Sequence, residues 1–142
     1  MVHPQLSEFC KQLTTISQEN GEKAPTFPEV LIKFESWAQS FGLMADNTHI
    51  ITFSGWDLEK CLPRLCSYYR MPVPTFLQPD NNLNMKMIYF SNMHEIPKSI
   101  PYILERLGLS FDGIKHRGLD DVRGQLKVVR YALENTCELD LV

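Results

Sequence analysis

The sequence has few cysteines, no long apolar run and no excess of positive charge. Its four cysteines form neither a Cys-x-x-Cys pair nor the framework of a disulfide-stabilised domain; they are Cys10, Cys61, Cys66 and Cys137. No uncharged stretch reaches the roughly 18 apolar residues of a membrane-spanning helix. The start, Met1-Val2-His3-Pro4, lacks the basic and apolar regions of an export signal. We therefore expect reduced thiols in a cytoplasmic or nuclear protein, with no membrane partner.

The charge balance excludes a strongly basic protein. The 142 residues include 17 acids and 14 bases, a net charge of −3, so a polyanion would have to be held by a local basic patch or a metal ion. No repeat, low-complexity segment or charge block divides the chain. With 44% apolar residues, we expect a single domain over residues 1–142 with its own core.

Hydrophobic periodicity predicts helices that alternate with short strands. Thr26 and Glu29 form a capping-box pattern before the clearest helix, which should end at Gly42. A buried strand at 49–53 should lead through Gly55-Trp56-Asp57 into a helix that Pro63 kinks. The other expected elements are helices at 6–16, 58–69, 97–107 and 119–133, a strand at 85–90, a polar loop at 18–25 and an irregular surface connection at 71–84. This alternation favours an α/β fold.

Two places carry residues suited to chemistry. Asp57 follows a predicted strand, and ligands of α/β proteins collect beyond the carboxyl ends of strands. His116, Asp120 and Asp121 stand together at the start of the last helix, where Gly118 would leave the backbone free to bring them into one cleft. Simpler interpretations stay open, since Asp57 could cap the next helix and the second group could be a surface ion cluster.

Carboxylates in this arrangement suit hard divalent cations. Mg²⁺ and Mn²⁺ prefer oxygen ligands and keep positions for water and substrate phosphates. Phosphodiester cleavage with two metal ions requires such oxygens and a base that deprotonates the attacking water. Asp57, Asp121 and His116 would fill three of these roles.

At these residues the sequence resembles the DEDDh 3'-5' exonucleases. It is most similar to the family of 3'-5' exoribonucleases that trim histone-mRNA stem-loop ends and small interfering RNAs. Gly55-Trp56-Asp57-Leu58 resembles the family's second motif, and His116-Arg117-Gly118-Leu119-Asp120-Asp121 resembles the third. Residues 4–14 and 26–31 resemble the stretch between the first two motifs, and Cys137-Glu138-Leu139 resembles the usual tail. The similarity covers nearly the whole chain, in order.

The resemblance implies an RNase H-like exonuclease fold that hydrolyses the 3' end of single-stranded RNA or DNA with two Mg²⁺ or Mn²⁺ ions. It assigns Asp57 and Asp121 as metal ligands and His116 as the general base, because an imidazole titrates near the working pH. We expect Trp56 and Arg117 to contact substrate and Asp120 to support the helix.

One departure from the family concerns its first motif, an Asp-x-Glu on the opening strand. That motif lies upstream of the stretch that Pro4 begins, and Asp57-Leu58-Glu59 does not replace it because Glu59 falls within a helix pattern. We therefore expect a domain truncated at the N-terminus, the C-terminal two-thirds of the family domain, without the opening β-meander and two of the four carboxylates. A chain of this kind should hydrolyse RNA weakly or not at all, unless a second chain completes the sheet.

Other interpretations of the chain stay open. The chain could be a catalytically inactive nucleic-acid-binding or protein-interaction module with the same fold. Lys60, Arg64 and Arg70 could follow a phosphate backbone or simply form a solvated face. A zinc site is disfavoured, because the Cys-x4-Cys spacing within a helix separates the two thiols by about 140°. In the last helix, Gly124 indicates either local weakness of about 1 kcal/mol or close packing.

Overall fold

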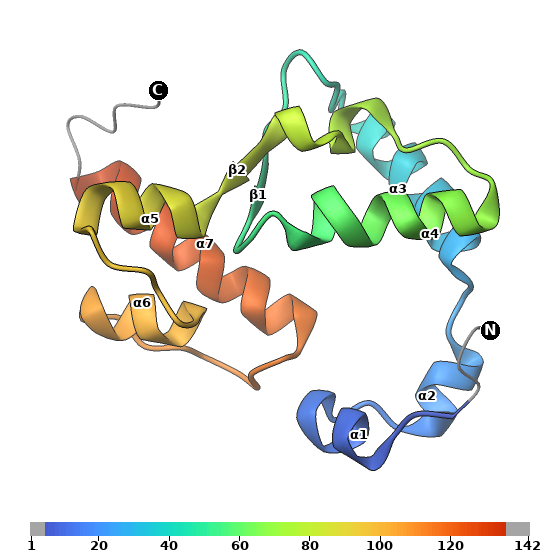
Figure 1. Ribbon diagram of the computed structural model, residues 1–142, viewed down its shortest axis with the longest axis horizontal. Coiled ribbons are helices and arrows are strands. Elements are labelled where there is room, and N and C mark those ends of the chain that lie inside the picture. Colours follow the sequence, from blue (N-terminus) through green and yellow to red (C-terminus); the bar gives the residue numbers. More distant parts are fainter. Residues whose placement is uncertain (1–4, 136–142) are drawn as a thin grey trace. The chain divides into compact units, whose positions relative to one another are not determined.

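The computed structural model describes residues 5–135, which form helices and one small sheet (Figure 1). Pro4 and the tail motif at 137–139 lie outside the described residues. The chain divides into two compact units, unit 1 with Met1–Ala24 and Pro97–Val142 and unit 2 with Pro25–Ile96. Within the described range, no helix is both long enough and apolar enough to span a membrane.

The sheet of unit 2 has two short parallel strands. β1 (Ile50–Thr52) lies within the predicted strand at 49–53 and pairs with β2 (Asn82–Asn84), with Ile51 opposite Leu83. The predicted strand at 85–90 is wrong, because this segment belongs to helix α5 (Met85–Met93). The Asn84 side chain caps α5 by accepting hydrogen bonds from the N–H groups of Lys86 and Met87. This cap converts an apolar segment that resembles a strand into a helix.

Helix α3 (Phe27–Ser40) begins as predicted. The Glu29 carboxylate accepts hydrogen bonds from the Thr26 N–H (2.6 Å) and hydroxyl (2.8 Å), which completes the capping box. The helix buries Leu31 and Ala38 against the core of unit 2 and ends before Gly42, whose φ is +68°.

The helix after β1 starts with an irregular turn. Asp57–Cys61 forms a π-helical turn (η1), in which the Leu62 N–H donates to the Asp57 carbonyl, and α4 (Leu62–Tyr69) continues from it. Pro63 has no N–H and crowds the carbonyl four residues earlier, so a wider turn just before it relieves the clash. The extra residue also lets Leu58 and Cys66, eight positions apart, both reach the core.

The connection between α4 and β2 is partly buried, against the prediction of a surface segment. Two 3₁₀ turns, η2 (Thr75–Leu77) and η3 (Pro79–Asn81), shape it, and Phe76 and Leu77 are buried. The core of unit 2 consists of Leu31, Ala38, Leu58, Cys66, Phe76 and Leu77. The rings of Phe34, Trp37 and Phe41 form a row along helix α3, with Trp37 5.5 Å from Phe34 and 5.3 Å from Phe41. Phe34 in turn lies 5.9 Å from the core residue Phe76.

Unit 1 opens with two short helices, α1 (Glu8–Thr14) and α2 (Gln18–Lys23). The first lies inside the predicted helix, whereas the prediction of a loop at 18–25 is wrong. Ser17 and Asn20 form a capping box that starts α2, and the Gln18 side chain accepts a hydrogen bond from the Leu6 N–H at 2.8 Å. The sequence signal for this helix was Ser17-x-x-Asn20, a capping box in which Asn stands in place of the usual Glu or Gln.

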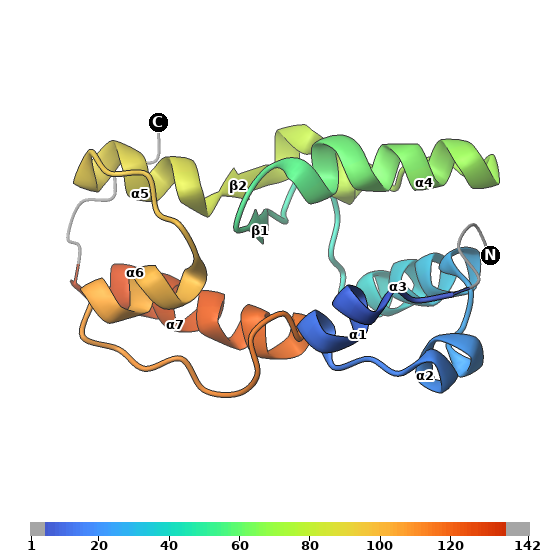
Figure 2. The same cartoon turned by 60° about the horizontal axis from the view of Figure 1, so that its bottom comes forward.

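The rest of unit 1 is a pair of helices that lie side by side, α6 (Ile100–Arg106) and α7 (Gly118–Asn135) (Figures 1 and 2). Gly124 is buried at their contact: a Cβ there would lie 2.9 Å from Ile100 Cγ2 and 3.1 Å from Phe111 Cε2. The close-packing interpretation of Gly124 is therefore correct.

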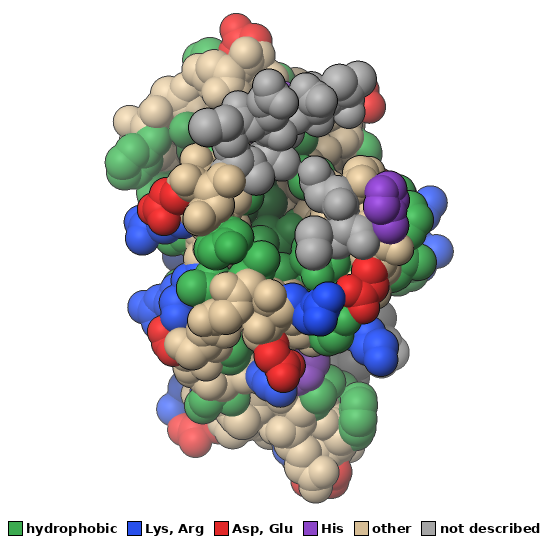
Figure 3. Space-filling view, turned by 90° about the vertical axis from the view of Figure 1, so that its left-hand side faces the viewer, with side chains coloured by type: hydrophobic (Ala, Val, Ile, Leu, Met, Phe, Trp, Pro, Cys, Tyr) green, Lys and Arg blue, Asp and Glu red, His purple; other side chains and the backbone are tan. Residues whose placement is uncertain are grey.

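Helix α7 buries a different face from the one that its apolar periodicity indicates. It buries Gly124 and Val128. The apolar stripe that marks this helix in the sequence is exposed instead: Leu119 is 65%, Val122 58%, Leu126 46% and Leu133 71% exposed. Figure 3 likewise shows hydrophobic side chains at the surface among charges of both signs.

Candidate active site

Asp57 lies just beyond the carboxyl end of β1, where the strand gives way to a helix. Gly55 is buried in the turn, Trp56 is 56% exposed, and Asp57 is the first residue of η1. The Asp57 carboxylate makes no hydrogen bond or ion pair with another residue that the structure describes. Helix capping therefore does not account for this side chain, and its oxygens are accessible to a ligand.

Lys86 also lies near this end of the sheet and was not among the residues singled out from the sequence. Its N–H donates to the Phe53 carbonyl at 3.2 Å, and its ammonium lies 5.2 Å from the centroid of the Phe53 ring. The position of Lys86 depends on the start of α5, in a segment that the sequence analysis predicts to be a strand. Asn84, as a possible helix N-cap, was the sequence signal that could have revealed the start of α5 and so the position of Lys86.

His116 occupies a tight turn directly before α7. The Arg117 N–H donates to the Ile114 carbonyl at 3.2 Å, and His116 has a left-handed backbone with φ +64°. Both side chains are exposed. Gly118 does not provide the predicted backbone freedom, because it is already the first residue of α7 and is not among the residues with positive φ.

Asp121 begins the hydrogen-bonded ladder of α7. Its N–H donates to the Arg117 carbonyl at 2.9 Å, and the residue is partly buried. His116, Arg117 and Asp121 thus lie on one tight turn and the first turn of one helix, all within unit 1.

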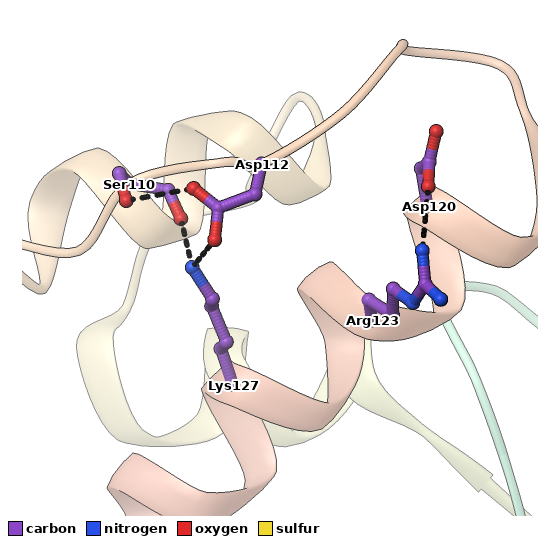
Figure 4. A network of polar contacts seen from close by, with 5 residues as sticks. All are labelled: Ser110, Asp112, Asp120, Arg123 and Lys127. Carbon is purple, nitrogen blue, oxygen red and sulfur yellow. Dashed lines mark hydrogen bonds and ion pairs between the residues drawn. The ribbon is translucent and has the colours of Figure 1, made fainter.

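Asp120 connects this turn to the helix. One carboxylate oxygen accepts the Ile114 N–H at 3.0 Å, and the other lies 3.3 Å from the guanidinium of Arg123 (Figure 4). Gly113, with φ +104°, allows the close approach, because a Cβ there would lie 2.5 Å from Asp120 Cγ. Asp120 therefore fixes the segment that carries His116.

A second tie holds the loop before the turn. The Lys127 ammonium donates to the Ser110 carbonyl at 2.9 Å and to the Asp112 carboxylate at 2.5 Å (Figure 4). The bonds from Lys127 and from the Ser110 hydroxyl lower the pKa of Asp112.

The donor chemistry of these residues fits a hard divalent cation. Asp57 in unit 2 and Asp121 in unit 1 each offer carboxylate oxygens. Among the described residues, no three His, Cys, Asp or Glu side chains form a group that could hold a metal ion.

The family model for RNase T, described as "Exonuclease", matches residues 2–129. The chain is 34% identical to rat (Rattus norvegicus) "3'-5' exoribonuclease 1" over 97% of its own length. It is also similar to the solved nuclease domain of 3'hExo, described as a DEDDh family member bound to rAMP, with 33% identity and a TM-score of 0.80 over 95% of this chain. A structure of 3'-end recognition of the histone mRNA stem-loop by a 3'-exonuclease shares 30% identity and a TM-score of 0.80 over 94% of the chain.

These matches extend over only part of the related proteins. The chain spans 40% of the rat enzyme, 68% of the first solved structure and 60% of the second.

Proposed function

Because the chain belongs to the exonuclease family, we propose that residues 1–142 form an exonuclease-like domain that hydrolyses phosphodiester bonds at the 3' end of single-stranded RNA. The observation that carries the proposal is the family match over residues 2–129. It includes the strand-end Asp57 and the turn-and-helix group from His116 to Asp121 in the same order. Such a protein would work where its RNA is found, in the cytoplasm or the nucleus.

Exonucleases of this type generally use divalent metal ions. We assign Asp57 and Asp121 as the carboxylates that would hold Mg²⁺ or Mn²⁺. When bound, these ions would supply charge stabilisation at the phosphate and lower the pKa of water. The imidazole of His116 would take the proton from the attacking water, a role that its exposed position on the turn permits.

The neighbouring residues would orient the substrate. The exposed indole of Trp56, next to Asp57, can stack on a terminal base, and the exposed guanidinium of Arg117 can pair with a phosphate. Asp120 acts as a positioning residue, since it holds Ile114 of the His116 turn against α7.

The described sheet is smaller than a parallel sheet usually is. Its two strands have three residues each, and parallel sheets are normally covered on both faces and contain more strands. We propose that a second chain supplies further strands and carboxylates when the enzyme reaches full activity.

A second candidate is a catalytically inactive module that binds RNA or a protein partner. This alternative retains the exposed side chains of Trp56 and Arg117. In this alternative, Trp56 and Arg117 would still bind RNA but no bond would be cleaved.

An assay on 3'-labelled single-stranded RNA with Mn²⁺ separates the two candidates. We expect weak release of labelled mononucleotide by the wild type, and its loss in His116→Ala. Lys33→Gln, a change of an exposed residue in α3, serves as the control. Turnover that survives His116→Ala would remove the assignment of the base, and binding without turnover would favour the inactive module.

A further inference from the structure

Helix α3 has a second apolar face beside the one that it buries. Leu31 and Ala38 face the core of unit 2, whereas a row of large apolar side chains, about 80° further around the helix, is exposed. This row, called here the α3 stripe, consists of Val30 (47% exposed), Phe34 (37%), Trp37 (50%) and Phe41 (68%). All four residues belong to unit 2, so the stripe is a feature of that unit alone.

The α3 stripe has the spacing of a helix that packs along another helix. Its members are four, three and four residues apart, the alternation that keeps one seam facing a partner helix. None of the four side chains carries a charge. The rings of Phe34, Trp37 and Phe41 also contact one another in sequence, so they form one continuous surface. The spacing therefore predicts a helical partner for the stripe.

The stripe fits a protein better than it fits RNA. A stacking platform for bases requires free ring faces and cations that follow the phosphates. The rings of Phe34 and Trp37 instead stack on each other with an interplanar angle of 22°, which covers one face of each ring. Helix α3 has one cation, Lys33, against two acids, Glu29 and Glu35. The stripe thus lacks the features that would hold a nucleotide chain.

The exposed area of the stripe suits contact between two copies of the chain. An aromatic side chain offers about 150–250 Å² when it is fully exposed, so the four side chains together expose roughly 400 Å². Two stripes in contact would bury roughly 800 Å² of apolar surface. Because homodimer interfaces are about 65% apolar, this area corresponds to an interface of about 1,200 Å², within the range of specific complexes.

The stripe is complementary to itself when two copies lie antiparallel. A two-fold axis that crosses α3 midway between Phe34 and Trp37 places Phe34 of one copy opposite Trp37 of the other. The same axis places Val30, the smallest member, opposite Phe41, the most exposed one. We propose that the α3 stripe is the interface of a homodimer in which the two α3 helices pack antiparallel. Helix α3 contains none of the assigned catalytic residues, so this dimer does not depend on the proposed function.

Sedimentation equilibrium of the full chain over a range of concentrations tests the dimer. The variants Val30→Lys and Phe41→Glu each place one charge in the stripe, at opposite ends of it. Ile32→Glu is the matched control, because Ile32 is also an exposed apolar residue of α3 (56%) but lies on the far side of the helix from the stripe. Circular dichroism verifies that each exposed substitution leaves the fold intact.

We expect the wild type to change from one chain to two in the micromolar range, and each stripe variant to dimerise at least tenfold more weakly, because its new charge would be buried without a partner. An equimolar mixture of Val30→Lys and Phe41→Glu should associate more tightly than either variant alone. The antiparallel register places the new ammonium of one chain against the new carboxylate of the other. Ile32→Glu should dimerise like the wild type.

Three results would overturn the proposal. A wild type that stays monomeric up to about 100 μM would mean that a different protein covers the stripe. A loss in Ile32→Glu equal to that in the stripe variants would place the interface elsewhere. A mixture that associates no better than the separate variants would exclude the antiparallel register. None of these results would change the proposed function.

Discussion

Gly113 and Asp120 contact each other so closely that residue 113 has no room for a side chain. A Cβ would lie 2.5 Å from Asp120 Cγ, and the φ of +104° is one that L side chains rarely adopt. Because the same carboxylate accepts the Ile114 N–H, this contact determines how the His116 turn joins α7.

Gly113→Ala should therefore destabilise the protein by about 2–3 kcal/mol, from backbone strain together with the collision. Gly42→Ala is the matched control, since Gly42 also has positive φ but a Cβ there would meet no atom within 4 Å, and it should cost only about 1 kcal/mol. Urea unfolding measures both. Equal losses of unfolding free energy in the two variants would show that the contact with Asp120 contributes nothing to stability.

Gly124→Ala should also destabilise, although alanine is the better helix former. The gain of about 1 kcal/mol in helix propensity is outweighed by overpacking against Ile100 and Phe111, which costs about 1–3 kcal/mol. Gly118→Ala, on the same helix with open space around it, should instead stabilise by about 0.5 kcal/mol. Adding Ile100→Ala should cost less in the Gly124→Ala background than in the wild type; strict additivity would argue against the packing explanation.

The capping box of α3 predicts acid sensitivity. Hydrogen bonds from the backbone and the hydroxyl of Thr26 lower the pKa of Glu29 from its ordinary value of 4.5. A carboxyl group with a lower pKa in the folded state contributes stability above the unfolded pKa and loses it as the pH falls through the folded value. Between pH 6 and pH 3, wild type should thus lose more stability than Glu29→Gln, as urea midpoints will show. Glu35→Gln, in the same helix, should behave like wild type.

Tyr89→Phe should leave stability unchanged or raise it by about 1 kcal/mol. Tyr89 is 8% exposed, and its hydroxyl is buried with no hydrogen-bond partner among the described residues. Removal of an unsatisfied buried hydroxyl avoids its desolvation cost. Tyr68→Phe, at a 63% exposed position, should have no effect on the thermal midpoint. A clear destabilisation by Tyr89→Phe would mean that the hydroxyl has a partner after all.

The sequence was most informative where local chemistry determines local structure. The Thr26–Glu29 box, the strand at 49–53 and the last helix are confirmed, and the similarity to solved exonuclease structures confirms the α/β, RNase H-like fold. The prediction of a strand at 85–90 was wrong because a short apolar run fits either a strand or a helix. The Asn84 cap favours the helix. The apolar periodicity of α7 did not identify its buried face, because that face is set by the close packing of Gly124 against Ile100 and Phe111.

The candidate site was predictable in part. Its acidic residues and His116 follow from the motifs, and His116, Asp120 and Asp121 do share one turn and helix. The place of Lys86 near the end of the sheet was not predictable, because it depends on where helix α5 starts. The roles of the motif residues stay predictions.

The exposed Trp56 gives the protein an intrinsic optical reporter. The sequence has only two tryptophans, and Trp37 lies between the rings of Phe34 and Phe41 on α3. In a Trp37→Phe background, all indole fluorescence would come from the residue next to Asp57. Quenching or a shift of this emission would then follow occupation of the strand-end site directly, without a label and without turnover.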